Sequence, residues 1–165
     1  MDITIEDAAR IALIGAGATA CMDLWLALLR RLDVPTLDFA MLGRWVGHWR
    51  RGVVAHAAIG KAAAVQGERA LGWLVHYATG IAFAAVLVAI AGTGWIRNPT
   101  LLPALGWGVA TVALPWLVMQ PAMGAGIAAA NTPAPARNRA RSLANHAVFG
   151  LGLYLSALLL AWIAR

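Results

Sequence analysis

The chain has 165 residues, of which 61% are hydrophobic and only 12% are charged. This composition lies outside the range of soluble domains and indicates a protein whose main partner is the lipid bilayer. The net charge of +6 does not indicate nucleic-acid binding, because the basic residues flank apolar stretches, where lipid headgroups and membrane topology account for them.

Four apolar stretches predict an all-α membrane protein: four transmembrane helices in a compact bundle that forms a single domain over residues 1–165. A helix rises about 1.5 Å per residue, so about 20 residues cross the roughly 30 Å hydrocarbon layer, and each stretch is close to that length. The four stretches are Ile11–Leu29, Trp73–Ala91, Leu101–Met119 and Leu143–Ala164.

The first stretch contains a cysteine and an acidic residue. Cys21 is the only cysteine, so an intrachain disulfide is excluded. The segment before the stretch is acidic rather than basic, so we expect a retained helix and not a signal peptide. Asp23 is the first candidate for function, because a carboxylate in a membrane span needs a cation, a proton or an arginine partner. Ala16, Ala20 and Ala27 put it on a small-residue face that we expect to contact other helices.

The loop after the first stretch predicts an amphipathic helix over about residues 36–51, with Thr36 as its N-cap. Apolar and aromatic side chains fall on one face of this helix, and Arg44, His48 and Arg51 fall on another. This pattern is typical of a helix that lies flat at the membrane interface, here on the cytoplasmic side. The alternative is that the three basic residues bind an anion such as a phosphate, a carboxylate or a lipid headgroup.

The distribution of Lys and Arg predicts the orientation in a bacterial inner membrane. Ten basic residues lie in the loop after the first stretch and the segment after the third, and three lie on the opposite side. Basic loops stay in the cytoplasm, so both termini are expected outside it. The ten are Arg30, Arg31, Arg44, Arg50, Arg51, Lys61, Arg69, Arg137, Arg139 and Arg141; the three are Arg10, Arg97 and Arg165.

Two histidines lie near the cytoplasmic starts of the second and fourth stretches. His76 and His146 are each followed four residues later by a glycine, Gly80 and Gly150. The match suggests that the two helix pairs are a parallel duplication. Two facing histidines with adjacent glycines also suit the axial ligands of a b-type haem, or a transition metal. The alternative is that each histidine forms hydrogen bonds between helices at the headgroup level.

The third stretch adds further polar and sulfur-containing candidates. Pro115 predicts a kink within the stretch. Gln120 follows at its cytoplasmic end, and a metal ion bound by the histidines would take Asp23, Met119 or Met123 as further ligands.

Five longer segments are distinctive enough to compare with known families. They are GATACMDLW (17–25), GRWVGHWRRG (43–52), GERALGWLVHYATGIAFA (67–84), PTLLPALGWGVATVALPWLVMQPAMGAGIAAANTPAPARNRARSL (99–143) and HAVFGLGLY (146–154). Together they cover most of the chain and resemble the bacterial integral-membrane family catalogued as domain of unknown function 2938. The resemblance implies a compact multi-span inner-membrane protein, and it implies no activity, cofactor or catalytic residue.

Three functions remain open at this point. The first is a non-enzymatic protein that binds or passes a small solute or cation at a polar site formed by Asp23, His76, Gln120, Asn145 and His146. The second is a membrane redox protein that holds haem b or a metal through His76 and His146. The third is a lipid-headgroup-modifying enzyme that uses the basic face of the amphipathic helix, although no local catalytic motif is present. Four transmembrane helices offer few surfaces to line a transport pathway. If the protein is a transporter, we therefore expect a homo-oligomer.

Overall fold

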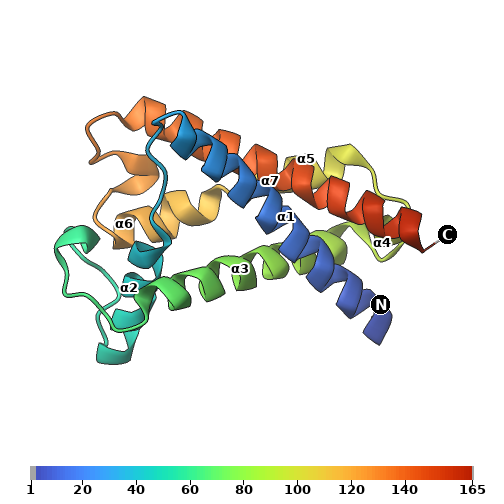
Figure 1. Cartoon of the computed structure of the whole chain (residues 1–165), viewed down its shortest axis with the longest axis horizontal. Helices are drawn as coiled ribbons and strands as arrows, with labels where there is room; N and C mark the ends of the chain where they lie inside the picture. Colours follow the sequence, from blue (N-terminus) through green and yellow to red (C-terminus); the bar gives the residue numbers. More distant parts are fainter. Residues whose placement is uncertain (1–2, 165) are drawn as a thin grey trace. The chain divides into compact units, whose positions relative to one another are not determined.

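The structure, a computed structural model, describes residues 3–164, and these form helices and loops without a β-strand (Figure 1). This confirms the all-α prediction for the described residues. The elements are α1 (Ile5–Arg31), α2 (Phe39–His48), η1 (Trp49–Arg51), η2 (Ile59–Lys61), α3 (Glu68–Ala91), α4 (Gly94–Arg97), α5 (Leu101–Ala110), η3 (Pro115–Met119), α6 (Gln120–Ala122), η4 (Ile127–Ala129) and α7 (Pro135–Ile163).

Four helices are long and apolar enough to cross a membrane, when α5, η3 and α6 are taken together. The predicted apolar stretches lie on these helices, apart from Ala164 just after the last one, and each helix extends beyond its stretch at one end or both. Their length and composition are those of a multi-pass membrane protein. The four helices are Ile5–Arg31, Glu68–Ala91, Leu101–Ala122 and Pro135–Ile163.

The third of these helices is not a regular α-helix. α5 ends at Ala110, and the chain is wound as a π-helix from Pro115 to Met119 before α6 begins. Pro115 has no N–H to donate to the carbonyl four residues earlier, so the regular hydrogen-bond ladder is interrupted there. The next N–H, of Trp116, bonds to the carbonyl of Val112 at 3.1 Å. The irregularity predicted at Pro115 is therefore a widened helical turn.

The chain divides into two compact units, each made of separate segments. Unit 1 comprises the residues up to Val34, Tyr77–Thr111 and the residues from Ala144 onward. Unit 2 comprises Pro35–His76 and Val112–Leu143. Helices α3 and α7 contribute residues to both units.

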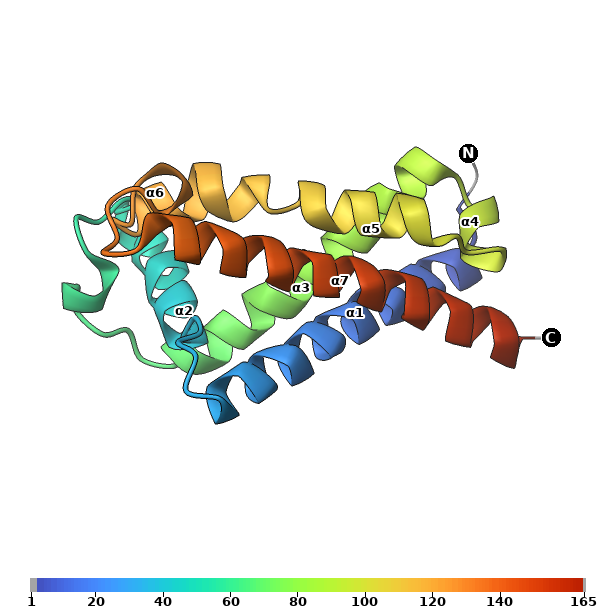
Figure 2. The same cartoon turned by 90° about the horizontal axis from the view of Figure 1, so that it is seen from above.

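Unit 1 is built around one hydrophobic core. Residues of α1, α3, α5 and α7 supply it, together with two from α4, and Figure 2 shows α5 and α7 running next to each other. Small side chains alternate with large ones, so the helices interdigitate closely. The core residues are Ile11, Ile14, Ala18, Ala84, Leu87, Val88, Trp95, Ile96, Ala104, Phe149, Leu153 and Ala157.

Two helix pairs in unit 1 cross at glycines. A Cβ added at Gly80 on α3 would collide with the side chain of Thr19 on α1, and a Cβ added at Gly15 on α1 would collide with the α3 backbone at Gly80. A Cβ added at Gly150 on α7 would collide with the α5 backbone at Ala104 and Leu105, and a Cβ added at Gly108 on α5 would collide with the backbone of Gly150. Small residues are what such close helix contacts require in a membrane. The two crossing glycines are those that follow the two histidines by four residues, so the sequence match has a counterpart in the packing.

Unit 2 contains α2, whose N-terminal cap is Asp38. The Asp38 carboxylate accepts a hydrogen bond of 2.9 Å from the N–H of Ala40, and the helix begins at Phe39. The prediction that Thr36 caps the helix is wrong, because Asp38 supplies the cap oxygen two residues later. A 3₁₀ turn, η1, then completes the segment up to Arg51.

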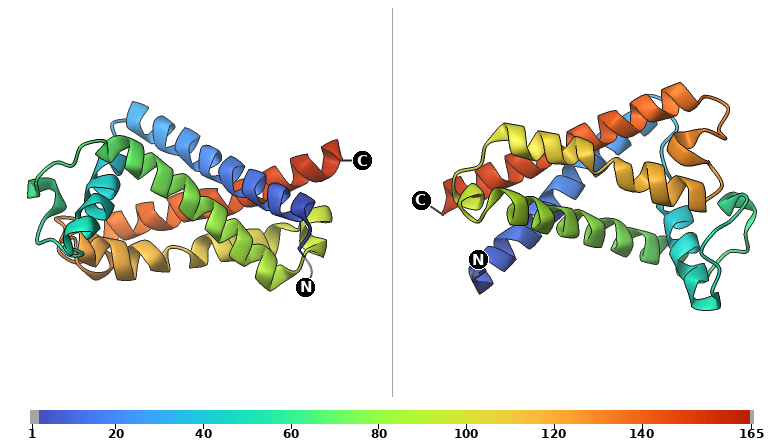
Figure 3. Two further views of the ribbon diagram at one scale, coloured as in Figure 1. Left: turned by 90° about the horizontal axis from the view of Figure 1, so that it is seen from below. Right: turned by 180° about the vertical axis from the view of Figure 1, so that it is seen from behind.

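The loop after η1 is attached to the end of the third long helix (Figure 3). The backbone N–H of His56 donates to the carbonyl of Ala122 at 2.7 Å, and that of Ile59 donates to the carbonyl of Met123 at 3.1 Å. Gly124, with a φ of +92°, lies against the backbone of Ala57, so a side chain at this position would collide with it. The loop thus bonds to carbonyls at the C-terminal end of α6, where no further helical turn supplies donors.

Candidate functional site

Asp23 is bonded to a tyrosine on a neighbouring helix in unit 1. The hydroxyl of Tyr77 on α3 donates to Oδ2 of Asp23 on α1 at 2.9 Å. Tyr77 is a neutral donor, so it holds one carboxylate oxygen in place without supplying positive charge. Both residues are half-buried. This contact is a polar interaction between two helices, α1 and α3, that are otherwise largely apolar.

The buried face of α1 differs slightly from the small-residue face of the sequence analysis. Asp23, Ala16, Ala20 and Ala27 are all half-buried, so they lie at the margin of the buried face and not at its centre. Thr19 is buried, and its hydroxyl donates to the carbonyl of Gly15 at 2.8 Å. The buried residues of α1 are Asp7, Ile11, Ile14, Gly15, Ala18, Thr19 and Leu26.

Asn145 joins α7 to α1 in the same unit. Its side-chain oxygen accepts a 2.9 Å hydrogen bond from the indole N–H of Trp25. Trp25 lies two residues after Asp23 on α1, so the two residues point in different directions from the helix axis. The indole N–H is satisfied by an amide on another helix, which fixes the rotation of both side chains.

His146 is held in one tautomer by Thr111. The Thr111 hydroxyl donates its single hydrogen to the carbonyl of Gly108 at 2.6 Å, and its oxygen lies 2.8 Å from Nδ1 of His146. The hydroxyl hydrogen is already used, so Nδ1–H must be the donor in the second bond. In neutral His146 the lone pair is therefore on Nε2, the atom with which imidazole commonly binds a metal.

His76 and Gln120 belong to unit 2, whereas Asp23, Asn145 and His146 belong to unit 1. The His76 ring stacks on Phe39 of α2, with ring centres 4.1 Å apart, and meets the edge of Trp73 at 6.0 Å. Gln120 lies at the start of α6 and its side-chain oxygen is buried. The structure thus brings three of the five predicted site residues into one unit and the other two into the second.

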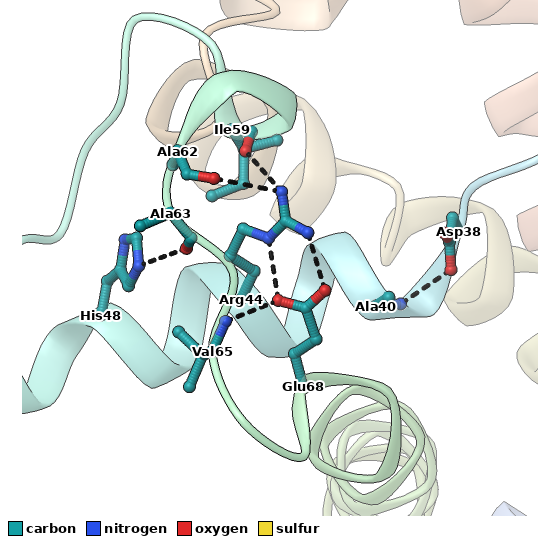
Figure 4. A network of polar contacts seen from close by, with 9 residues as sticks. All are labelled: Asp38, Ala40, Arg44, His48, Ile59, Ala62, Ala63, Val65 and Glu68. Atoms are coloured by element: carbon teal, nitrogen blue, oxygen red, sulfur yellow. Dashed lines mark hydrogen bonds and ion pairs between the residues drawn. The ribbon is translucent and has the colours of Figure 1, made fainter.

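Arg44 is the centre of a polar network in unit 2 (Figure 4). Its Nε and Nη2 donate to the two carboxylate oxygens of Glu68 at 2.8 and 2.7 Å. Its Nη1 donates to the carbonyls of Ala62 at 3.2 Å and Ile59 at 3.5 Å. The hydrogen bonds to Glu68 raise the pKa of the Arg44 guanidinium above its ordinary value. Arg44 therefore fastens the loop and the start of α3 to α2.

The other two residues of the predicted anion site differ from Arg44 in exposure and bonding. Nε2 of His48 lies 3.0 Å from the carbonyl of Ala63, and Nδ1 lies 2.6 Å from Nε2 of His56. Arg51 is exposed on η1. Anion binding by these three residues stays a prediction, and in this arrangement an anion would compete with Glu68 for Arg44.

Sequence reasoning missed an ion pair at the start of α1. Asp7 is 2% exposed, and its Oδ1 accepts a 3.0 Å bond from Nη2 of Arg97 at the end of α4. Thr4 and Asp7 also form a reciprocal N-terminal cap on α1. The Thr-x-x-Asp spacing could have revealed the cap. Nothing in the sequence pointed to Arg97 as the partner.

The described residues contain no cluster of three or more His, Cys, Asp or Glu side chains that could hold a metal ion. A pocket lies at the end of unit 1 that contains α4, and it includes none of the predicted site residues. It is lined by Arg97, Asn98, Pro99, Thr100, Leu155, Leu158, Leu159, Ala161 and Trp162.

Comparison with known proteins gives one match. The family model described as protein of unknown function (DUF2938) matches residues 12–160. No curated protein and no solved structure matches the chain.

Proposed function

The chain belongs to the DUF2938 family, and on that premise we propose that it is a multi-pass protein of the bacterial inner membrane that binds or passes a small cation or solute. The proposed orientation puts both termini outside the cytoplasm, as the distribution of Lys and Arg favours. The proposed binding residue is Asp23, with Asn145 and His146 as further polar residues of unit 1.

The observation that carries this proposal is the 2.9 Å hydrogen bond from Tyr77 to Asp23. A carboxylate within an apolar helix is costly and is a functional candidate by default. Tyr77 orients one oxygen of this carboxylate through a neutral hydroxyl, so the bond adds no positive charge. A carboxylate oxygen oriented in this way is a candidate ligand for a cation that enters from the aqueous side.

The proposal is tested by the effect of cations on thermal unfolding in detergent. A cation that binds the folded protein raises the melting temperature with concentration. We expect NaCl, KCl or MgCl₂ to raise it relative to choline chloride at equal ionic strength, and Asp23→Asn to abolish the cation-specific rise. Asp33→Asn is the matched control, because Asp33 is exposed just beyond the end of α1. Equal melting temperatures for the wild type in all four salts would contradict cation binding.

A second candidate is a haem or metal protein, and one observation favours it. The tautomer that Thr111 imposes on His146 puts the imidazole lone pair on Nε2. Histidines that bind metals are held in this way by a hydrogen bond from their other nitrogen. The group bound by His146 would supply redox chemistry.

A further inference from the structure

Three buried side-chain nitrogen or oxygen atoms among the described residues have no hydrogen-bond partner, and all three belong to unit 2. They are Nδ1 of His56, Nε1 of Trp116 and Oε1 of Gln120. Buried polar atoms of this kind are few in folded proteins, and each needs an explanation such as a bound ligand. None of the three lies in the Asp23 region of unit 1, so an inference from them does not rest on the proposed cation site.

The hydrogen bonds of His48 define which hydrogen His56 carries. The carbonyl of Ala63 can only accept, so Nε2 of His48 donates to it at 3.0 Å. In neutral His48 the other nitrogen, Nδ1, is then an acceptor. It receives its hydrogen from Nε2 of His56 at 2.6 Å. Neutral His56 therefore carries its lone pair on Nδ1, and this buried atom requires a hydrogen-bond donor.

Trp116 and Gln120 project from the same side of one helix. They are four residues apart, on the π-helix η3 and at the start of α6, and residues at this spacing share a helix face. The segment that carries His56 is bonded to the end of the same helix through Ala122 and Met123. The donor of Trp116 and the acceptors of Gln120 and His56 thus come from two segments that are hydrogen-bonded to each other.

Unit 2 also carries the whole net charge of the chain. It holds eight of the thirteen Lys and Arg residues and two of the seven Asp and Glu residues, whereas unit 1 holds five of each. A unit with a net charge of +6 attracts anions. The eight basic residues are Arg44, Arg50, Arg51, Lys61, Arg69, Arg137, Arg139 and Arg141.

We propose that the buried polar atoms of His56, Trp116 and Gln120 form a binding site for a phosphate that carries an O–H group. The O–H of the phosphate donates to Nδ1 of His56. An unprotonated phosphate oxygen accepts from the indole N–H of Trp116, and a second O–H or oxygen bonds to the Gln120 amide, which can present either its oxygen or its nitrogen. Inorganic phosphate and the singly protonated form of a phosphate monoester, free or on a lipid, share this chemistry.

The acceptor on His56 makes the site selective against sulfate. Sulfate has the size and charge of hydrogen phosphate, but it carries no hydrogen at neutral pH and leaves Nδ1 without a donor. A site that leaves a buried acceptor unpaired rejects the analogue that lacks the hydrogen. Charge attraction alone, by contrast, would bind the two anions similarly.

The test is isothermal titration of sodium phosphate into the purified protein in nanodiscs of zwitterionic lipid at pH 7.0, with sodium sulfate as the comparison. We expect phosphate to bind and sulfate to bind at least tenfold more weakly. His56→Gln can direct an amide N–H at His48 but moves its acceptor away from the position of Nδ1, and Trp116→Phe removes only the indole N–H. Each should weaken phosphate binding about tenfold, as the loss of one buried hydrogen bond does. Trp162→Phe, which removes the indole N–H of an exposed tryptophan in unit 1, should change it less than twofold.

Three outcomes would overturn the proposal: no phosphate binding, equal binding of sulfate, or unchanged binding in both His56→Gln and Trp116→Phe. If His56→Gln does not fold, Trp116→Phe alone decides. The source of the phosphate follows from nanodiscs that contain phosphatidic acid, a monoester, or phosphatidylglycerol, a diester whose phosphate carries no O–H. Competition by phosphatidic acid alone identifies a lipid headgroup, and competition by neither lipid identifies a soluble phosphate.

Discussion

Tyr77 on α3 donates its hydroxyl hydrogen to Asp23 on α1 at 2.9 Å, across 54 positions of sequence. Removing the hydroxyl in Tyr77→Phe should lower the free energy of unfolding by about 0.5–1.5 kcal/mol, the usual contribution of one hydrogen bond. A double-mutant cycle with Asp23→Ala, which removes the acceptor oxygens, isolates the pair when it is measured by unfolding in detergent. Strictly additive effects of the two substitutions would show that the contact contributes nothing to stability.

The crossing of α5 and α7 should tolerate no side chain at Gly150. A methyl group there would collide with the backbone of Ala104 and Leu105, so Gly150→Ala should destabilise the protein by about 1–3 kcal/mol. Gly106→Ala is the matched control on α5, because a Cβ at Gly106 meets no atom within 4 Å. The control should melt at or slightly above the wild-type temperature, because alanine is more favourable than glycine inside a helix. If both variants melt alike, the close crossing is not what stabilises this helix pair.

The fork-like contact of Arg44 with Glu68 should require arginine. Arg44→Lys keeps the charge but cannot bond to both carboxylate oxygens and to the loop carbonyls at once, so unfolding should become easier by about 1–3 kcal/mol. Arg51→Lys, on the exposed turn η1, should change stability by less than about 0.5 kcal/mol. The measurement is the melting temperature in detergent. An unchanged melting temperature in Arg44→Lys together with a lowered one in Arg51→Lys would contradict the structural role assigned to the contact.

A haem or metal protein would reveal itself in the absorption spectrum of the purified protein. If His76 and His146 hold haem, preparations from a haem-replete host should show a Soret band that both His76→Ala and His146→Ala abolish. For a metal, the metal content should fall in the same variants. Asn145→Ala, next to His146 in sequence, serves as the control and should keep the band. A folded preparation without colour or stoichiometric metal rejects this candidate.

The proposed orientation can be tested with single cysteines in a Cys21→Ala background. Thr93 lies between α3 and α4, and Lys61 lies on the exposed loop of unit 2. An impermeant thiol reagent should label Thr93→Cys in intact cells and Lys61→Cys only after the membrane is permeabilised, because the basic loops are expected in the cytoplasm. Labelling of Lys61→Cys but not of Thr93→Cys in intact cells would show that the topology is the inverse of the proposed one.

The four long helices were predictable because bilayer thickness fixes their length, and a run of apolar residues reveals it directly. Their ends were less predictable. Thr36 and Asp38 both offer a cap oxygen, and the sequence does not say which one the chain uses. The disturbance at Pro115 was predictable because proline lacks the N–H of a regular helix.

The partners of the candidate residues could not be predicted for a different reason. Helices that are apolar on nearly every side do not reveal which face meets which neighbour, so neither Tyr77 as the partner of Asp23 nor Thr111 as the partner of His146 follows from the sequence. The same holds for Arg44 and Glu68, which are 24 positions apart. In His56 the decisive property is a missing partner, which only the surrounding atoms reveal.

The core of unit 1 has a consequence for the order of events during synthesis. Ile11 and Ile14 of α1 are buried together with Phe149 and Leu153 of α7. The chain leaves the ribosome from its N-terminus, so α1 enters the bilayer long before α7 has been made. Until then the core of unit 1 lacks the residues that α7 contributes to it. Release of the nascent chain before Phe149 therefore leaves unit 1 unassembled, and quality-control proteases would meet a three-helix intermediate rather than a finished protein.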